Sequence, residues 1–196
     1  MYPKVIKHLI EDFQKLPGIG EKTAERLALH VVTNFSTDEV ESFSINLKRA
    51  KLELSFCQTC GLLTDINPCK ICQNELRDLE TMMIVSESRD VFLLEKTNSF
   101  RGQYHVLGGL IDFSRGITER DLNLANFKSR LSKIKEVVIA TNSTVEGEMT
   151  AQYIKAILQG SSIKITRLAY GIPAGSDLKY ADSQTLSQAI LNRRDF

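Results

Sequence analysis

The chain of 196 residues contains no tryptophan, only four prolines and only four cysteines, and its formal net charge is +1. No run of residues approaches the roughly 20 apolar positions that a membrane-spanning helix needs. The segment Met1–Lys4 passes directly into an amphipathic stretch, without the apolar core and cleavage site of a signal peptide. We therefore expect a cytoplasmic globular protein with no membrane segment.

The near-zero net charge excludes a protein that binds nucleic acid through a uniformly basic surface. Lysine and arginine together number 25, against 24 aspartates and glutamates. Binding to DNA would need basic side chains gathered on one face, or several copies of the chain acting together. Any DNA site must therefore be sought in local motifs rather than in overall composition.

The four cysteines form two Cys-x-x-Cys pairs separated by eight residues: Cys57, Cys60, Cys69 and Cys72. Each pair brings two thiolates from one tight turn to the same ion, and a tetrahedral site with four sulfur ligands favours zinc. Because cysteine fills all four positions, no place is left for a catalytic water. The pattern predicts one structural zinc ion per chain; a redox dithiol or four reduced cysteines in a loop are the alternatives.

The first 55 or so residues carry helical periodicity in three segments, over 4–15, from about 21, and from a cap at Ser36 or Thr37. We expect the third helix to turn four apolar residues inward, at positions Val40, Phe43, Leu47 and Ala50. So small a helical body needs support from its neighbours to stay folded.

A glycine hairpin, Leu16-Pro17-Gly18-Ile19-Gly20, joins the first two of these helices. Glycine lets the backbone turn tightly and approach a partner, and the free N–H groups of the next helix suit a phosphate oxygen. Lys22 and Arg26, four residues apart, add positive charge. The pattern predicts sequence-independent contact with a phosphate backbone; an ordinary turn between two helices is the alternative.

From about residue 80 predicted strands alternate with predicted helices, which indicates an α/β sheet of the parallel type. The predicted strands are Met82–Val85, Tyr104–Leu107, Glu136–Ala140 and Ser162–Leu168. The predicted helices lie near 90–96, 118–133 and 147–159, with a C-terminal helix over 182–194 capped by Asp182 or Ser183.

Acidic residues follow two of these strands: Glu87 after the first, and Glu146 and Glu148 after the third. The carboxyl ends of parallel strands meet at one edge of a sheet, where ligands bind. Carboxylates gathered there are typical of Mg²⁺ and phosphoryl chemistry. Two other interpretations remain open: a negative face for a basic partner, or solvated glutamates favoured by a helix dipole.

Two regions resemble known domains. The hairpin with Lys22 and Arg26 resembles the helix-hairpin-helix motif of DNA repair proteins. The α/β region resembles a Toprim domain, in which catalytic members carry an Asp-x-Asp pair; Asn142 and Thr144 stand at those positions here. The loss of two carboxylates predicts a protein without catalytic residues. A Mg-dependent Toprim enzyme, either a small nuclease or primase-like, is the alternative.

The chain as a whole resembles the RecR family of recombination mediators. The resemblance is carried by the hairpin, the cysteine module and Arg77-Asp78, and by the segments 104–109, 140–150, 169–173 and 180–182. It implies an α+β chain in four parts: a helix-hairpin-helix region over 1–55, a four-cysteine zinc finger over 56–76, a Toprim domain over 79–172, and a C-terminal tail and oligomer interface over 173–196.

The resemblance also implies the function. RecR proteins are not enzymes; they form dimers that close into a ring-like tetramer able to encircle DNA, and work with RecO, and in many bacteria RecF, to load RecA on gapped DNA coated by single-strand-binding protein. Carried onto this chain, the DNA contacts are Gly18, Gly20, Lys22 and Arg26. The residues expected to contact RecO are Glu146, Glu148 and Glu87. A zinc-stabilised module with no DNA contact is the third possibility.

Overall fold

The computed structural model describes residues 2–169 and 171–193. The chain divides into two compact units, residues 1–54 and residues 55–196. The first is entirely helical, and the second holds the cysteine module, a four-stranded sheet and a C-terminal helix. The predicted α+β fold class is thereby confirmed.

The first unit contains α1 (Lys4–Gln14), α2 (Glu21–Asn34) and α3 (Thr37–Glu53). α1 and α2 pack against each other, and Ala24 and Ala28 are completely buried. Alanine is suited to this contact because its short side chain lets two helices approach closely. Ser36 is the N-cap residue of α3: its hydroxyl accepts from the Glu39 amide, and the Glu39 carboxylate accepts from the Ser36 amide.

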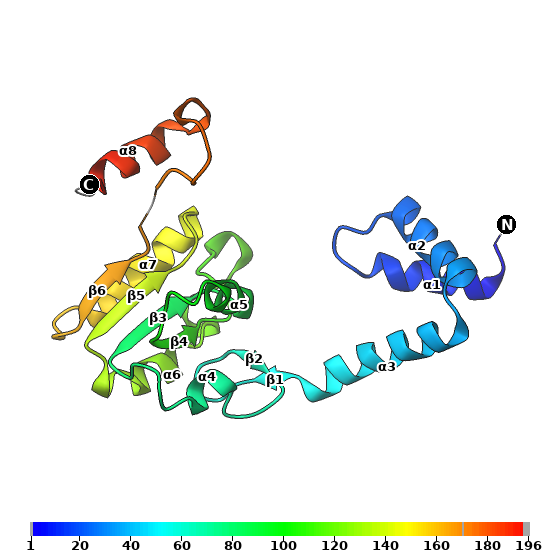
Figure 1. Cartoon of the computed structure of the whole chain (residues 1–196), viewed down its shortest axis with the longest axis horizontal. Coiled ribbons are helices and arrows are strands. Elements are labelled where there is room, and N and C mark those ends of the chain that lie inside the picture. The colour runs from blue at the N-terminus through cyan, green and yellow to red at the C-terminus, as the bar shows by residue number, and fades with distance from the viewer. Residues whose placement is uncertain (1, 170, 194–196) are drawn as a thin grey trace. The chain divides into compact units, whose positions relative to one another are not determined.

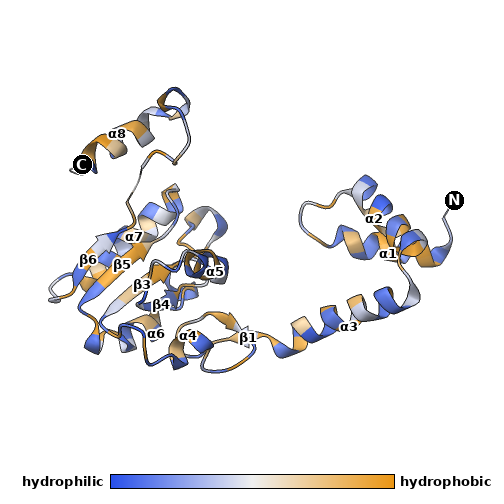
Figure 2. Cartoon of the chain, in the orientation of Figure 1, coloured by the Kyte–Doolittle hydropathy of each residue, from blue (hydrophilic) through white to orange (hydrophobic). Residues whose placement is uncertain are grey.

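The predicted inward stripe of α3 is wrong, because every side chain of this helix is exposed. Phe43 is 52% exposed and Leu47 is 66% exposed. Figure 2 shows hydrophobic positions recurring along the length of α3. Periodicity revealed an apolar face but not what covers it, and nothing in the described chain does.

In the second unit, four parallel strands form one sheet in the order β4-β3-β5-β6 (Figure 1). They are β3 (Thr81–Val85), β4 (Gln103–Val106), β5 (Glu136–Ala140) and β6 (Lys164–Arg167). Val85 lies opposite Val106 on one side and Ala140 on the other, so the carboxyl ends of the three strands are level. The predicted parallel sheet is confirmed.

The sheet has a core on each face because successive side chains of a strand point to opposite sides. Met82 and Ile84 face α6 (Leu124–Ser129) and α7 (Val145–Leu158), whose buried residues include Phe127 and Ile154. Met83 and Val85 face the other way, toward α5 (Ser88–Lys96) and the cysteine module.

The cysteine module consists of β1 (Ser55–Phe56), β2 (Leu63–Thr64) and the short helix α4 (Lys70–Gln73). Its cysteines and Leu62 are part of the same buried cluster as Tyr104 and Val106 of β4. The module therefore covers the part of this sheet face next to the edge strand β4.

The continuous helix predicted over 118–133 is wrong. That segment is a 3₁₀ turn (Glu119–Asp121), then α6, then a second 3₁₀ turn (Leu131–Lys133). The helix is interrupted because Asn123 forms hydrogen bonds at the end of β4. Its amide donates to the Leu107 carbonyl, and its side chain donates to the Val106 carbonyl. Helical periodicity carries no trace of these long-range bonds.

The C-terminal segment holds a 3₁₀ turn (Leu178–Tyr180) and α8 (Ser183–Leu191), which Asp182 caps by accepting from the Thr185 amide. The expected C-terminal helix and its cap are confirmed. Tyr170 of the family-like segment, and the last predicted helical position, 194, lie outside the described residues. No helix in the described ranges is long and apolar enough to cross a membrane.

Candidate functional site

The glycine hairpin is exposed, and its geometry depends on its glycines. Gly18 has a φ of 79°, in the left-handed region that side chains rarely adopt. Gly20 is the N-cap residue of α2, and no side chain caps the helix there. A Cβ added at Gly20 would meet nothing within 4 Å. Open surface thus lies in front of backbone N–H groups at a helix N-terminus, which is where anions bind.

Two basic side chains lie beside this turn on the exposed side of α2. Lys22 and Arg26 are not buried, and neither forms an ion pair with any described residue. Glu25 lies between them in sequence, but its carboxylate accepts a hydrogen bond from the Tyr2 hydroxyl. The structure therefore brings together the four predicted DNA-contacting residues and leaves both cations available.

The four cysteines meet at one point of the second unit. Their sulfur atoms all lie within 4.8 Å of one another, and the Cys60 and Cys69 sulfurs are 3.6 Å apart. A tetrahedral site with Zn–S bonds of about 2.3 Å places its sulfurs about 3.8 Å apart. The four side chains fit a metal ion that favours sulfur ligands, and three of the four are buried.

Hydrogen bonds within the cluster shift the pKa values of its thiols in opposite directions. Hydrogen bonds from the Cys60 and Cys72 thiols lower the pKa of Cys69 to about 2, whereas the bond to Cys69 raises the pKa of Cys60 to about 12. The thiols therefore share their protons through hydrogen bonds within the cluster. A bound divalent ion would release those protons and take thiolates as ligands.

Backbone contacts attach the cysteine module to strand β4. The Val106 amide donates to the Cys60 carbonyl at 2.7 Å, which continues the hydrogen bonding of the edge strand. Gly61 has a φ of 79°, and a Cβ there would lie 2.7 Å from the Val106 carbonyl oxygen. Only glycine lets this turn approach the strand so closely.

Arg77, just after the module, makes a second attachment. Its guanidinium forms two hydrogen bonds of 2.8 Å to Glu95 of α5, and Nε donates to the Gly102 carbonyl at 2.7 Å. It also lies over the Tyr104 ring, 5.5 Å from the centroid. The bond from Arg77 lowers the pKa of Glu95. The Arg77 side chain is only 9% exposed, so this pair is a structural link rather than a surface ion pair.

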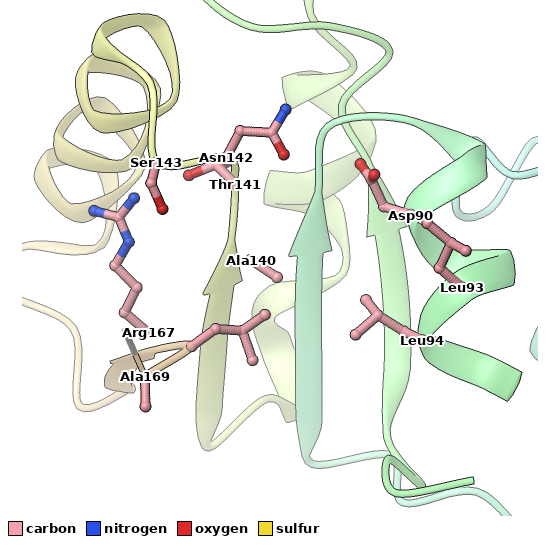
Figure 3. A pocket seen from close by; sticks show the side chains of 10 residues that line it. Asp90, Leu93, Leu94, Ala140, Thr141, Asn142, Ser143, Arg167 and Ala169 are labelled. Atoms are coloured by element: carbon pink, nitrogen blue, oxygen red, sulfur yellow. The ribbon is translucent and has the colours of Figure 1, made fainter. Parts of the chain in front are cut away.

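At the carboxyl end of the sheet, a crevice of about 420 Å³ is lined by Asn142, Ser143, Asp90 and Arg167 (Figure 3). Thr144, at the second position of the expected Asp-x-Asp pair, is the N-cap residue of α7, and its hydroxyl accepts from the Gly147 amide at 3.2 Å. The neutral side chain at this position thus holds the start of a helix.

The three predicted acidic residues do not converge. The Glu87 side chain caps α5 in a reciprocal pair with Asp90, and Glu148 binds Arg167 with an N–O distance of 2.5 Å. Within residues 2–169 and 171–193, the four cysteines are the only group of three or more acidic, histidine or cysteine side chains close enough to share a metal ion. The glutamates are therefore not arranged as a metal clamp.

Two arginines that line the cavities at the candidate sites were not predicted from the sequence. Arg167 lies at the end of β6, and Figure 3 shows its guanidinium beside Ser143, across the crevice from Asp90. Arg130, between α6 and the following turn, binds the start of β4. An arginine next to the last position of the predicted strand Ser162–Leu168 was a signal for the first; no local signal marks the second.

These parts define a class of protein: a helix-hairpin-helix unit joined to a Toprim-type sheet through a four-cysteine centre. Models of known families match the same parts, namely the helix-hairpin-helix of RecR over residues 6–50, the Toprim domain over 80–169, and the C-terminal region of RecR over 171–194.

Full-length relatives agree with these matches. The chain is 49% identical over 197 residues to "Recombination protein RecR" of Streptococcus sanguinis strain SK36, covering 100% of this chain and 99% of that protein. It is 47% identical over 194 residues to the protein of that name from Lactococcus lactis subsp. cremoris strain SK11, covering 98% of each. The chain belongs to the RecR family of recombination proteins.

Proposed function

We propose that this protein is a non-catalytic recombination mediator of DNA repair, which binds DNA without sequence preference and helps load RecA on gapped DNA coated by single-strand-binding protein. The observation that carries the proposal is the exposed hairpin at the start of α2, where an uncapped helix N-terminus lies beside Lys22 and Arg26. Such contacts grip phosphates and carry no base information.

The test compares full-length wild type with the double variant Lys22→Ala/Arg26→Ala on end-labelled gapped DNA in a native gel. We expect at least about a tenfold loss of affinity and a weaker dependence on salt, since each lost phosphate contact lowers the slope by about 0.9. Lys48→Ala/Lys51→Ala, which removes the same charge from α3, is the matched control. Equal DNA retention by wild type and the hairpin variant would reject the hairpin as the DNA grip.

The proposal that the protein is not an enzyme rests on the crevice. Asn142 and Thr144 supply no carboxylate, and the glutamates Glu87 and Glu148 are engaged within the chain. Mg²⁺ sites of phosphoryl-transfer enzymes need several converging carboxylates. With Mg²⁺ added, we expect the gapped DNA to be recovered at its original length on a denaturing gel. Shortened or extended DNA would establish the Toprim-enzyme alternative.

We also propose that RecO, and RecF where it is present, bind acidic residues at the carboxyl end of the sheet. Of the three candidate glutamates, Glu146 is the one whose carboxylate forms no hydrogen bond or ion pair with another described residue, which leaves it for a basic partner. Glu146→Lys should weaken binding of purified RecO in calorimetry at least about tenfold, because it places like charges opposite each other. Glu75→Lys, a charge reversal in the cysteine module, should not.

The oligomer is proposed to be a dimer that closes into a tetrameric ring. In the first unit, Val40, Phe43, Leu47, Ala50 and Leu54 are all exposed and alternate in steps of three and four. That spacing is typical of a coiled-coil seam, and a second copy of the chain would cover it. Phe43→Asp should lower the assembly mass in sedimentation, whereas Ile45→Asp, similarly exposed but off the seam, should not.

One structural zinc ion per chain is proposed for Cys57, Cys60, Cys69 and Cys72, since four sulfurs at this spacing favour that metal. The domains are proposed to span 1–55, 56–76, 79–172 and 173–196, and the protein to act in the cytoplasm. Metal analysis of protein purified without added metal would test the zinc assignment; less than one zinc per chain, with another metal present, would contradict it.

A further inference from the structure

An arginine lies partly buried beside the cysteine centre without an acidic partner. The Arg130 guanidinium donates to the Tyr104 carbonyl at 2.7 Å and to the Gln103 side-chain oxygen at 2.7 Å, and it lies 3.3 Å from Nδ1 of His105. All three partners are neutral: burial lowers the pKa of His105 to about 4. In the described chain, no carboxylate forms an ion pair with Arg130.

The surroundings of Arg130 include the cysteine cluster. A small cavity of about 90 Å³ is lined by Arg130, Gln103, Arg77, Thr59 and Cys72. Arg77 is neutralised by its two bonds to Glu95. Arg130 therefore brings to this cavity a positive charge that no carboxylate neutralises. Cys72 lines the same cavity.

A charge in so confined a place needs compensation, because burying an isolated cation is costly. Four thiolates around one divalent ion leave two negative charges, which also need compensation. The positive charge of Arg130 would compensate the negative charge of the thiolate centre, and the thiolate centre would compensate the charge of Arg130. Residues just outside the ligand shell commonly tune the affinity of a metal centre, and replacing them weakens metal binding.

We propose that Arg130 is the counter-charge of the metal–tetrathiolate centre, held in place by the start of β4 so that metal affinity and the edge of the sheet are linked. The proposal rests on the assignment of zinc to the four cysteines. Arg130 touches no metal ion; it is a positioning residue that acts on the charge of the thiolates across the cavity.

The test measures zinc affinity of the full chain by competition with a chromophoric chelator. Arg130→Gln should bind zinc about tenfold more weakly, while Arg130→Lys, which keeps the charge but not the forked hydrogen bonds, should stay close to wild type. Lys128→Gln, the same charge change at an exposed position of α6, is the matched control and should not change affinity.

A second readout separates charge from structural support. With cobalt in place of zinc, the thiolate-to-metal charge-transfer band should move to longer wavelength in Arg130→Gln, because thiolates without a nearby cation are more electron-rich. The band should not move in Arg130→Lys. A role limited to supporting β4 predicts that both variants lose stability and that neither shifts the band.

Three results would overturn the proposal: unchanged zinc affinity in Arg130→Gln, a loss in Arg130→Lys as large as in Arg130→Gln, or an unmoved cobalt band. If Arg130→Gln does not fold, Arg130→Lys decides by itself, since wild-type affinity supports the charge role and a tenfold loss contradicts it. A wild-type protein that takes up no zinc would instead reject the underlying metal assignment.

Discussion

The two units of this chain bury their apolar residues very differently. In residues 2–54 only Ala24 and Ala28 are buried, and α3 is exposed along its whole length. The second unit closes a core on each face of its sheet, and one of them includes the cysteine module. The first unit therefore leaves an apolar helix face for another surface to cover, whereas the second covers both faces of its sheet with its own chain.

Glycines show the same contrast. Gly20 faces open surface, and an added Cβ would touch nothing within 4 Å. At Gly147, in the first turn of α7, a Cβ would lie 1.9 Å from the backbone oxygen of Asn142. One glycine is free to meet a partner, and the other is required by packing within the chain.

The largest effect should come from breaking the cysteine centre. Cys60→Ser removes one sulfur of a buried cluster that also holds Tyr104 and Val106, and should lower the free energy of unfolding of the second unit by on the order of 5 kcal/mol. Hydrogen exchange should show lost protection in β4 and unchanged protection in α1 and α2. Thr59→Ser in the same turn is the control; if exchange rises equally in both units, they are not independent.

A pair of glycine variants separates folding from binding. Gly147→Ala should destabilise the second unit by about 3 kcal/mol, because backbone must move to admit the Cβ. Gly20→Ala should leave stability near wild type yet weaken DNA binding, since the methyl group blocks close approach of a phosphate. Urea unfolding and native gels measure the two effects. An unfolded Gly20→Ala, or a stable Gly147→Ala, would remove the contrast.

The pH dependence of the second unit should reflect His105. Its folded pKa of about 4 lies below the ordinary 6.5, so stability is fully present above pH 6.5 and is lost as the pH falls toward 4. Between about pH 7 and pH 5 the unfolding free energy should fall by about 2 kcal/mol from this residue. In His105→Gln that part of the dependence should vanish. Urea unfolding at the two pH values measures this change. If wild type and His105→Gln lose the same unfolding free energy between pH 7 and pH 5, the dependence does not come from His105.

The smallest effect concerns the start of α3. Ser36→Ala removes the reciprocal bonds with Glu39 and should cost about 1 kcal/mol of helix stability. Amide exchange in the first turn of α3 should rise accordingly. Ser44→Ala, in the middle of the same helix, serves as comparison and should have little effect. If the two variants behave alike, the capping box does not hold the N-terminus of α3.

Local signals were sufficient for most of the elements. Strands β3 and β5, the cap at Ser36 and the cap at Asp182 all follow from patterns within a few residues. Where a prediction from the sequence was wrong, the structure depended on residues far away along the chain. The predicted helix over 118–133 is broken because Asn123 bonds to the end of β4, and α3 lacks a covering surface in the described chain.

The candidate sites also differ in whether short-range or long-range contacts determine them. The hairpin and the cysteine centre were predictable because turn chemistry and ligand spacing are short-range properties of a sequence. The arrangement of the glutamates at the carboxyl end of the sheet was predicted only in part. Placing Glu87 and Glu148 at one edge of a sheet follows from topology, but their engagement with Asp90 and Arg167 depends on side-chain directions that no spacing encodes.

The sequence by itself thus determined the order of the parts, the two pairs of cysteines, the glycine turn and the absence of two carboxylates at 142 and 144. The tertiary structure alone decided that the cysteine module serves as a layer of the sheet and that Arg130 faces its cavity without an acidic partner in the described chain. The reason is physical: turns and metal ligation act over a few residues, whereas charge compensation and packing join residues that the chain keeps far apart.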